Sequence, residues 1–189
     1  MAVPMRNRRI TIEEFEGMSE AGILTEDDRV ELIEGEIVEM TPIEAPHSGR
    51  TRWLIRELSR LFSERFILDV QNPIILRQQE SVLCPDLMLL PPREEFFGDV
   101  TPGPADARLL IEVVDTTLSR DRRKQRLYAQ AGVAEVWLVI IAEGKQSVLV
   151  CRRPEAGQYQ DVREYKRGEV IEFEGESFEV DAVLGKPRP

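Results

Sequence analysis

The sequence predicts a single domain of mixed α/β class, and three observations support this prediction. The chain has 189 residues, the length of one domain, and 42% of them are hydrophobic, which is enough for a sizeable core. Segments with apolar residues at helical spacing alternate with short β-rich runs. A strand–helix–strand succession over residues 108–141 favours a parallel pair of strands joined by a crossover helix.

Capping and turn residues predict the first elements. Thr11 with acidic residues in the following turn is typical of a helix start, and we expect this helix to run to about Ala21. The run Arg29–Met40 predicts two short strands around a Glu34–Gly35 turn, because strand-forming residues flank a turn-forming pair.

Apolar spacing and Gly/Pro positions predict the remaining elements. In chain order we expect a loop containing Pro42 and Pro46, a helix over Ser48–Phe66, strands within Phe66–Gln78 and Asp86–Pro91, a long loop over Pro92–Asp106, a strand over Arg108–Val114, a helix over Ser119–Ala131, and strands over Glu135–Ile141, Ser147–Arg153 and the last short segments. We expect residues 11–184 to form the domain, after a disordered basic arm over residues 1–10 and before a tail over residues 185–189.

Composition excludes several classes of protein. Cys84 and Cys151 cannot form a disulfide framework, and no run of about 18 apolar residues exists, so we expect a soluble cytoplasmic protein with no membrane partner. His47 is the single histidine, which excludes zinc sites of the HExxH and Cys/His types. No Gly-rich phosphate loop of the GxGxxG or P-loop type is present. A catalytic site in this chain would therefore be built from carboxylates and lysine, with or without a hard metal ion.

Charge is unevenly distributed along the chain. The net charge is −10, yet Arg52, Arg56 and Arg60 follow one another at i, i+4 and i+8 on a predicted helix, and Ser119–Arg126 carries five basic residues against one acid. A basic face of this kind suits a phosphate-containing partner. Ordinary solvated helix faces, with pairs such as Arg56–Glu57, are the alternative.

Two acidic residues occupy positions where burial is expected. Glu112 lies inside the apolar run LLIEVV, and Asp86 begins another apolar strand. A buried carboxylate costs several kcal/mol unless it is paired or binds a metal. If the two strands are neighbours, the carboxylates can converge, and Lys124 shares a helix face with Asp121 and Tyr128. Two carboxylates and an ammonium suit Mg²⁺-dependent phosphodiester hydrolysis. The alternative places Glu112 on an exposed edge, Asp86 in a turn and Lys124 in solvent.

The ordered series of motifs resembles a known family. A Pro-Asp pair before an apolar strand is followed by LLIEVV, D-x-x-K-x-x-x-Y and AGVAEVWLV, with VELIEGEIVEM upstream. This series is similar to that of the Uma-type endonuclease family, and the similarity covers residues 11–184. The resemblance implies a restriction-endonuclease-like fold of the PD-(D/E)-x-K superfamily, with a central mixed β-sheet flanked by helices, and Mg²⁺-dependent cleavage of DNA.

The resemblance also implies roles for single residues. Asp86 and Glu112 would bind the metal, and Lys124 would supply the catalytic lysine from a helix, because Val114 stands where the superfamily usually places it. Glu31 matches a further glutamate of the family and would support the metal or a water, or else lies exposed on the hairpin. The supporting residues implied are His47, Gln71, Asp121 and Tyr128, and the expected DNA contacts are Arg52, Arg56, Arg60, Arg120 and Arg123.

The sequence therefore predicts a DNA endonuclease that uses Mg²⁺ or Mn²⁺ and acts as a homodimer, since cutting both strands calls for two sites. Two alternatives stay open. The chain could be an inactive nuclease fold that binds nucleic acid or protein, or a phosphoesterase for small nucleotides.

Overall fold

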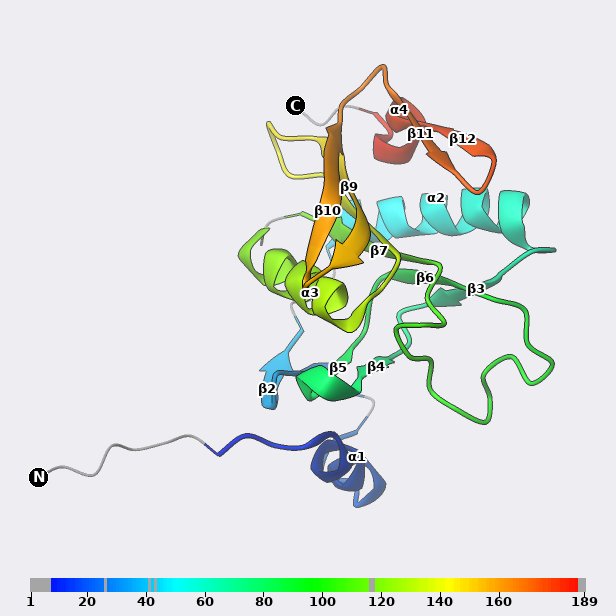
Figure 1. The fold of residues 1–189 in the computed structure, drawn as a ribbon. Coiled ribbons are helices and arrows are strands. Elements are labelled where there is room, and N and C mark those ends of the chain that lie inside the picture. The colour runs from blue at the N-terminus through cyan, green and yellow to red at the C-terminus, as the bar shows by residue number, and fades with distance from the viewer. Residues whose placement is uncertain (1–7, 26, 41, 43, 116–117, 187–189) are drawn as a thin grey trace, which may run out of the picture.

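The computed structural model describes residues 8–25, 27–40, 42, 44–115 and 118–186, except for the side chains of residues 118–121. It has the mixed α/β architecture that the sequence predicts, with a six-stranded sheet at its centre and helices on both faces (Figure 1). Helices α2 (Ala45–Phe62) and α4 (Val180–Leu184) pack on one face, and α3 (Leu118–Ala131) packs on the other. None of the described helices is long and apolar enough to span a bilayer.

The central sheet has the strand order β10-β9-β8-β7-β6-β3. Its strands are β3 (Ile67–Val70), β6 (Leu87–Leu90), β7 (Leu109–Val114), β8 (Glu135–Ile140), β9 (Ser147–Glu155) and β10 (Gln158–Tyr165). Strands β7 and β8 are parallel, with α3 between them in the chain, so the predicted strand–helix–strand unit is confirmed. The neighbouring pair β6 and β7 is antiparallel, which places the start of β6 beside the end of β7.

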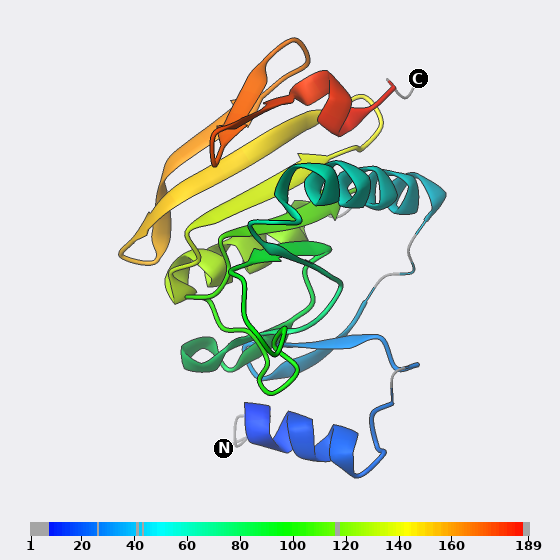
Figure 2. The same ribbon diagram turned by 90° about the vertical axis from the view of Figure 1, so that its right-hand side faces the viewer.

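A second sheet, built from the N-terminal half of the chain, packs on the same side of the central sheet as α3 (Figure 2). Its order is β2-β1-β5-β4, built from β1 (Val30–Ile33), β2 (Glu36–Glu39), β4 (Ile74–Leu76) and β5 (Ser81–Leu83), with a 3₁₀ turn over Arg77–Gln79. The predicted hairpin is confirmed, with Glu34 and Gly35 both at positive φ, as a two-residue turn of this kind requires. Helix α1 (Ile12–Glu20) packs beneath this sheet and has the expected Thr11 capping box.

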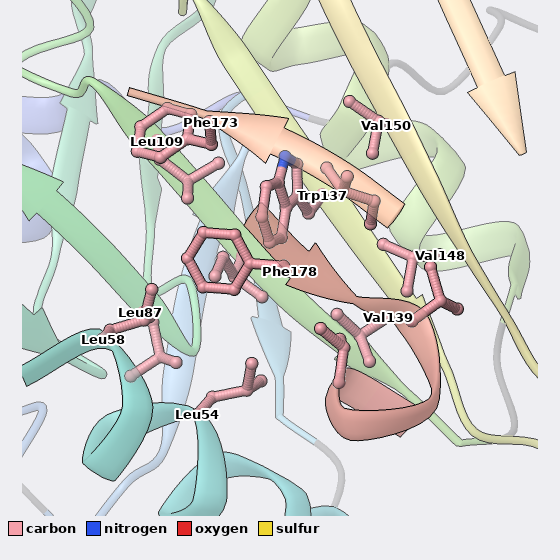
Figure 3. Packing of buried hydrophobic residues seen from close by; sticks show 14 of the residues in the cluster. Leu54, Leu58, Leu87, Leu109, Trp137, Val139, Val148, Val150, Phe173 and Phe178 are labelled. Atoms are coloured by element: carbon pink, nitrogen blue, oxygen red, sulfur yellow. The ribbon is translucent and has the colours of Figure 1, made fainter. Parts of the chain in front are cut away.

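The larger core lies between the central sheet, α2 and a C-terminal hairpin of β11 (Val170–Phe173) and β12 (Glu176–Glu179). Trp137 on β8 is fully buried there and meets the rings of Phe173 and Phe178 edge-on (Figure 3). This packing fixes β8, and through it the parallel strand β7, in the centre of the sheet.

The structure differs from the prediction in three places. Helix α2 begins three residues earlier than predicted, because Pro46 occupies its first turn, where a missing N–H costs nothing, and it ends at Phe62. Strand β5 was not predicted, since three buried residues give no alternation to detect. Residues 180–184 form a short helix instead of the predicted strand.

Candidate active site

Asp86 and Glu112 are brought together by the antiparallel pairing of β6 and β7. Leu87 lies opposite Ile111 in this antiparallel pair. Asp86, one residue before Leu87, therefore lies beside Glu112, one residue after Ile111. The backbone N–H of Val113 donates to Oδ2 of Asp86 at 2.8 Å. Glu112 alternates with Leu110 and Val114, whose side chains belong to the core on the α3 face, so its carboxylate also points to that face.

Asp86 is held by two further donors. Nε2 of His47, in the first turn of α2, lies 3.0 Å from Oδ2, and the side-chain amide of Gln71 donates to Oδ1 at 3.3 Å. Gln71 has a positive φ of 54° in the turn that follows β3, and its backbone N–H donates to the Asp86 carbonyl. A strained non-glycine residue that contacts a buried carboxylate is typical of a functional site. Two of the residues predicted to support the site, His47 and Gln71, therefore contact the carboxylate of Asp86.

Glu112 is contacted by two residues of α3. The hydroxyl of Tyr128 donates to Oε1 at 2.7 Å, and Nζ of Lys124 lies 3.3 Å from the same oxygen. All three side chains are buried. Val114, at the position where the sequence comparison expected a lysine on the strand, is buried on the same face of β7. The ammonium beside Glu112 instead belongs to Lys124 on helix α3. The alternatives of an exposed edge for Glu112 and a solvated Lys124 are wrong.

Glu31 on β1 completes the group from the second sheet. Nζ of Lys124 lies 2.7 Å from its Oε1, which also accepts the backbone N–H of Cys84 at 2.8 Å. Glu31 is only 2% exposed, so the alternative of an exposed hairpin residue is wrong. Cys84 N–H and Val113 N–H are the contacts that sequence reasoning missed, because a backbone donor leaves no trace in residue type.

Three buried acids lie close together in the site. Among the described residues, the carboxylates of Glu31 and Glu112 contact the ammonium of Lys124, and that of Asp86 contacts the imidazole of His47. Burial raises the pKa of Glu112 to about 8, which the nearby Lys124 opposes and the charges of Asp86 and Glu31 reinforce. Burial likewise raises the pKa of the Tyr128 hydroxyl, so this group stays a hydrogen-bond donor. A cation bound beside Asp86 and Glu112 would favour the charged form of Glu112, which burial disfavours.

This donor set suits a hard divalent cation. Mg²⁺ commonly uses one or two protein carboxylates and keeps several waters, and it would relieve the repulsion between Asp86 and Glu112. Within the part of the chain that the structure describes, no group of three or more His, Cys, Asp and Glu side chains is arranged to hold a metal. Asp86 and Glu112 are the two carboxylates that the strand pairing places side by side for such an ion.

Three of the described arginines expected to contact DNA form ion pairs with acids. Arg56 and Arg60 both form ion pairs with Glu57, at 2.9 and 3.1 Å, which is the intrahelical alternative. Arg123 forms ion pairs with Glu34 and Glu36 of the hairpin. Arg52 is exposed, and none of the described carboxylates forms an ion pair with it. The side chains of Arg120 and Asp121 lie outside the described residues.

Comparisons with known proteins concern the family and the fold of the chain. Residues 12–181 match the model of the Uma2 family, described as "Putative restriction endonuclease". Among solved structures, the chain is similar to a protein from Anabaena variabilis described as "a putative nuclease belonging to DUF820", with a TM-score of 0.71 at 15% identity over 93% of this chain and 97% of the other. That likeness confirms the predicted fold, a central mixed β-sheet flanked by helices. No curated protein matches the chain.

Proposed function

Since the chain belongs to the Uma2 family, we propose that it is a metal-dependent endonuclease that hydrolyses phosphodiester bonds of DNA. The observation that carries this proposal is the convergence of Asp86 and Glu112 from adjacent strands, with the ammonium of Lys124 3.3 Å from Glu112. Such a group supports phosphodiester hydrolysis, which can use carboxylates to hold a metal ion and a cation to offset charge on the phosphate.

Asp86 and Glu112 would hold Mg²⁺ or Mn²⁺. When bound, the ion would polarise a phosphoryl oxygen and make a water more acidic. Three hydrogen-bond donors contact the Asp86 carboxylate, namely the His47 imidazole, the Gln71 amide and the backbone N–H of Val113. These contacts fix the carboxylate in one orientation, as outer-shell partners of metal ligands generally do.

Lys124 would supply a positive charge close to the scissile phosphate. Its ammonium can orient the attacking water or offset negative charge that develops on the phosphoryl group. Glu31 supports this role by accepting from Nζ at 2.7 Å, and Cys84 N–H holds Glu31 in place. Tyr128 fixes the carboxylate of Glu112 from the same helix. In this proposal Glu31 and Tyr128 position the groups that contact metal and substrate.

The proposal is tested by incubating purified protein with supercoiled plasmid and Mg²⁺ or Mn²⁺. We expect the wild type to cut the plasmid, and Asp86→Asn, Glu112→Gln and Lys124→Ala to lose cleavage. Glu135→Gln is a matched control, because Glu135 lies on the neighbouring strand β8 and pairs with Arg152 away from these residues. Equal cutting by all variants would assign the activity to a contaminant and refute the proposal.

The same experiment decides between the proposal and the inactive-nuclease alternative. Retention of DNA in a gel without cleavage by any variant would identify a binding module, and hydrolysis of small nucleotides alone would identify a phosphoesterase. The homodimer remains part of the proposal. Light scattering with and without duplex DNA measures it directly.

A further inference from the structure

Arg50 is a half-buried arginine whose guanidinium has a donor without an acceptor. It lies in α2, and its Nη1 donates to the carbonyl of Ala182 at 3.3 Å. Its guanidinium also lies against Gly185, where a Cβ would clash with it, and 5.5 Å from the ring centre of Trp53. Nε is buried and has no hydrogen-bond partner among the described residues. A buried donor without an acceptor is costly, so a missing anion or water is the first explanation to test.

Arg167 approaches Arg50 from the turn between β10 and β11. Its Nη1 lies 3.1 Å from Oδ1 of Asp181, and its Nη2 donates to the side chain of Gln146 at 2.6 Å. Asp181 directly precedes Ala182, so the two guanidiniums meet at the same point of α4. The positive charge of Arg167 adds to burial in lowering the pKa of Arg50, which is the sign of two neighbouring like charges. Among the described residues, the carboxylate of Asp181 forms an ion pair with Arg167, and none forms one with Arg50.

The pair lies next to the candidate active site. Arg50 follows His47 by three residues in α2, so both side chains project from the same side of the helix about one turn apart. His47 contacts Asp86. A backbone phosphate that binds beside the metal carboxylates would therefore have this positive charge within reach, whereas Arg56, Arg60 and Arg123 are already paired with acids.

We propose that Arg50 and Arg167 form a subsite for a backbone phosphate of the DNA, next to the bond that is cleaved. This inference rests on the proposed nuclease function and adds a pair of arginines that the sequence did not predict. A phosphate oxygen would accept the N–H of Arg50 that lacks a partner among the described residues, and the guanidinium of Arg167 would add to the attraction.

The test is the salt dependence of binding to a short fluorescent duplex, measured without divalent ions between about 50 and 200 mM salt. We expect Arg50→Gln and Arg167→Gln each to reduce the slope of log affinity against log salt by about 0.9, the value for one lost phosphate contact. Arg50→Lys keeps the charge and should keep the slope. Arg163→Gln is the control, because Arg163 pairs with Glu169 and projects from β10.

Thermal unfolding of each variant separates this role from a structural one. A lower melting temperature with an unchanged slope would mean that Arg50 only anchors α4, and it would overturn the inference while leaving the nuclease proposal intact. If the wild type binds no duplex, the nuclease proposal fails, and inorganic phosphate then tests the subsite alone. Stabilisation of the wild type by phosphate at constant ionic strength, lost in Arg50→Gln, would support the subsite, and its absence would refute it.

Discussion

The ammonium of Lys124 lies 2.7 Å from Oε1 of Glu31, which joins α3 to the second sheet at the place where Glu112 points from the central sheet. Both residues are buried, so neither charge is shielded by water. The ion pair therefore sets the position of Lys124 relative to Glu112. A substitution of Glu31 tests this role directly.

Glu31→Gln keeps an oxygen that can accept from Cys84 N–H but removes the charge that holds Lys124. We expect plasmid cleavage to fall about 10- to 100-fold, as for other residues that orient a catalytic group. The affinity for Mg²⁺ should change much less than the rate, and calorimetry measures it. Equal losses of rate and affinity would instead identify Glu31 as a metal ligand.

The stability of the metal-free protein should fall as pH rises from about 4.5 to about 8. The pKa of Glu112 is raised from 4.5 to about 8, so the folded state binds a proton in this range that the unfolded chain has released. The slope from this group is at most about 1.4 kcal/mol per pH unit. Denaturant unfolding at several pH values measures it.

Glu112→Gln is the matched variant for this pH effect. We expect it to equal the wild type near pH 5, where Glu112 is neutral, and to be more stable near pH 9, where the wild type must bury a charge. A stability difference that does not grow with pH would contradict the raised pKa.

Metal binding near pH 7 should release a proton. Glu112 must lose its proton to become a ligand, and with a pKa of about 8 it is mostly protonated at that pH in the absence of metal. Mg²⁺ affinity should consequently increase with pH, up to about tenfold per unit below pH 8. Titration calorimetry in buffers of different ionisation enthalpy counts the protons, and metal binding without release would exclude Glu112 as a ligand.

Tyr128→Phe should move the pH profile of cleavage to higher pH. The hydroxyl of Tyr128 donates to Glu112 and favours its charged form, so its loss raises the pKa of Glu112 further. Loss of this buried hydrogen bond should also cost about 1 to 3 kcal/mol of stability. A lower rate with an unshifted profile would show that Tyr128 only contributes to packing.

The candidate site was predictable in part, and the reason differs for each residue. Glu112 could be found because an acid inside an apolar strand contradicts its surroundings, and Asp86 because it directly precedes another apolar strand. Tyr128 and Lys124 could be linked because helical spacing places them on one face. The burial of Glu31 could not be predicted, since its segment is rich in acids and nothing local distinguishes the one residue that faces inward.

The sequence by itself determined the α/β class, the hairpin at Glu34–Gly35, the cap at Thr11 and the parallel β7–β8 unit. These features depend on alternation, capping and turn chemistry, which act over a few residues. The tertiary structure alone decided that Glu34 neutralises Arg123 and that Arg50 meets Arg167 at α4. Such contacts join residues far apart in the chain, and their energies depend on strand order and burial, which no local pattern encodes.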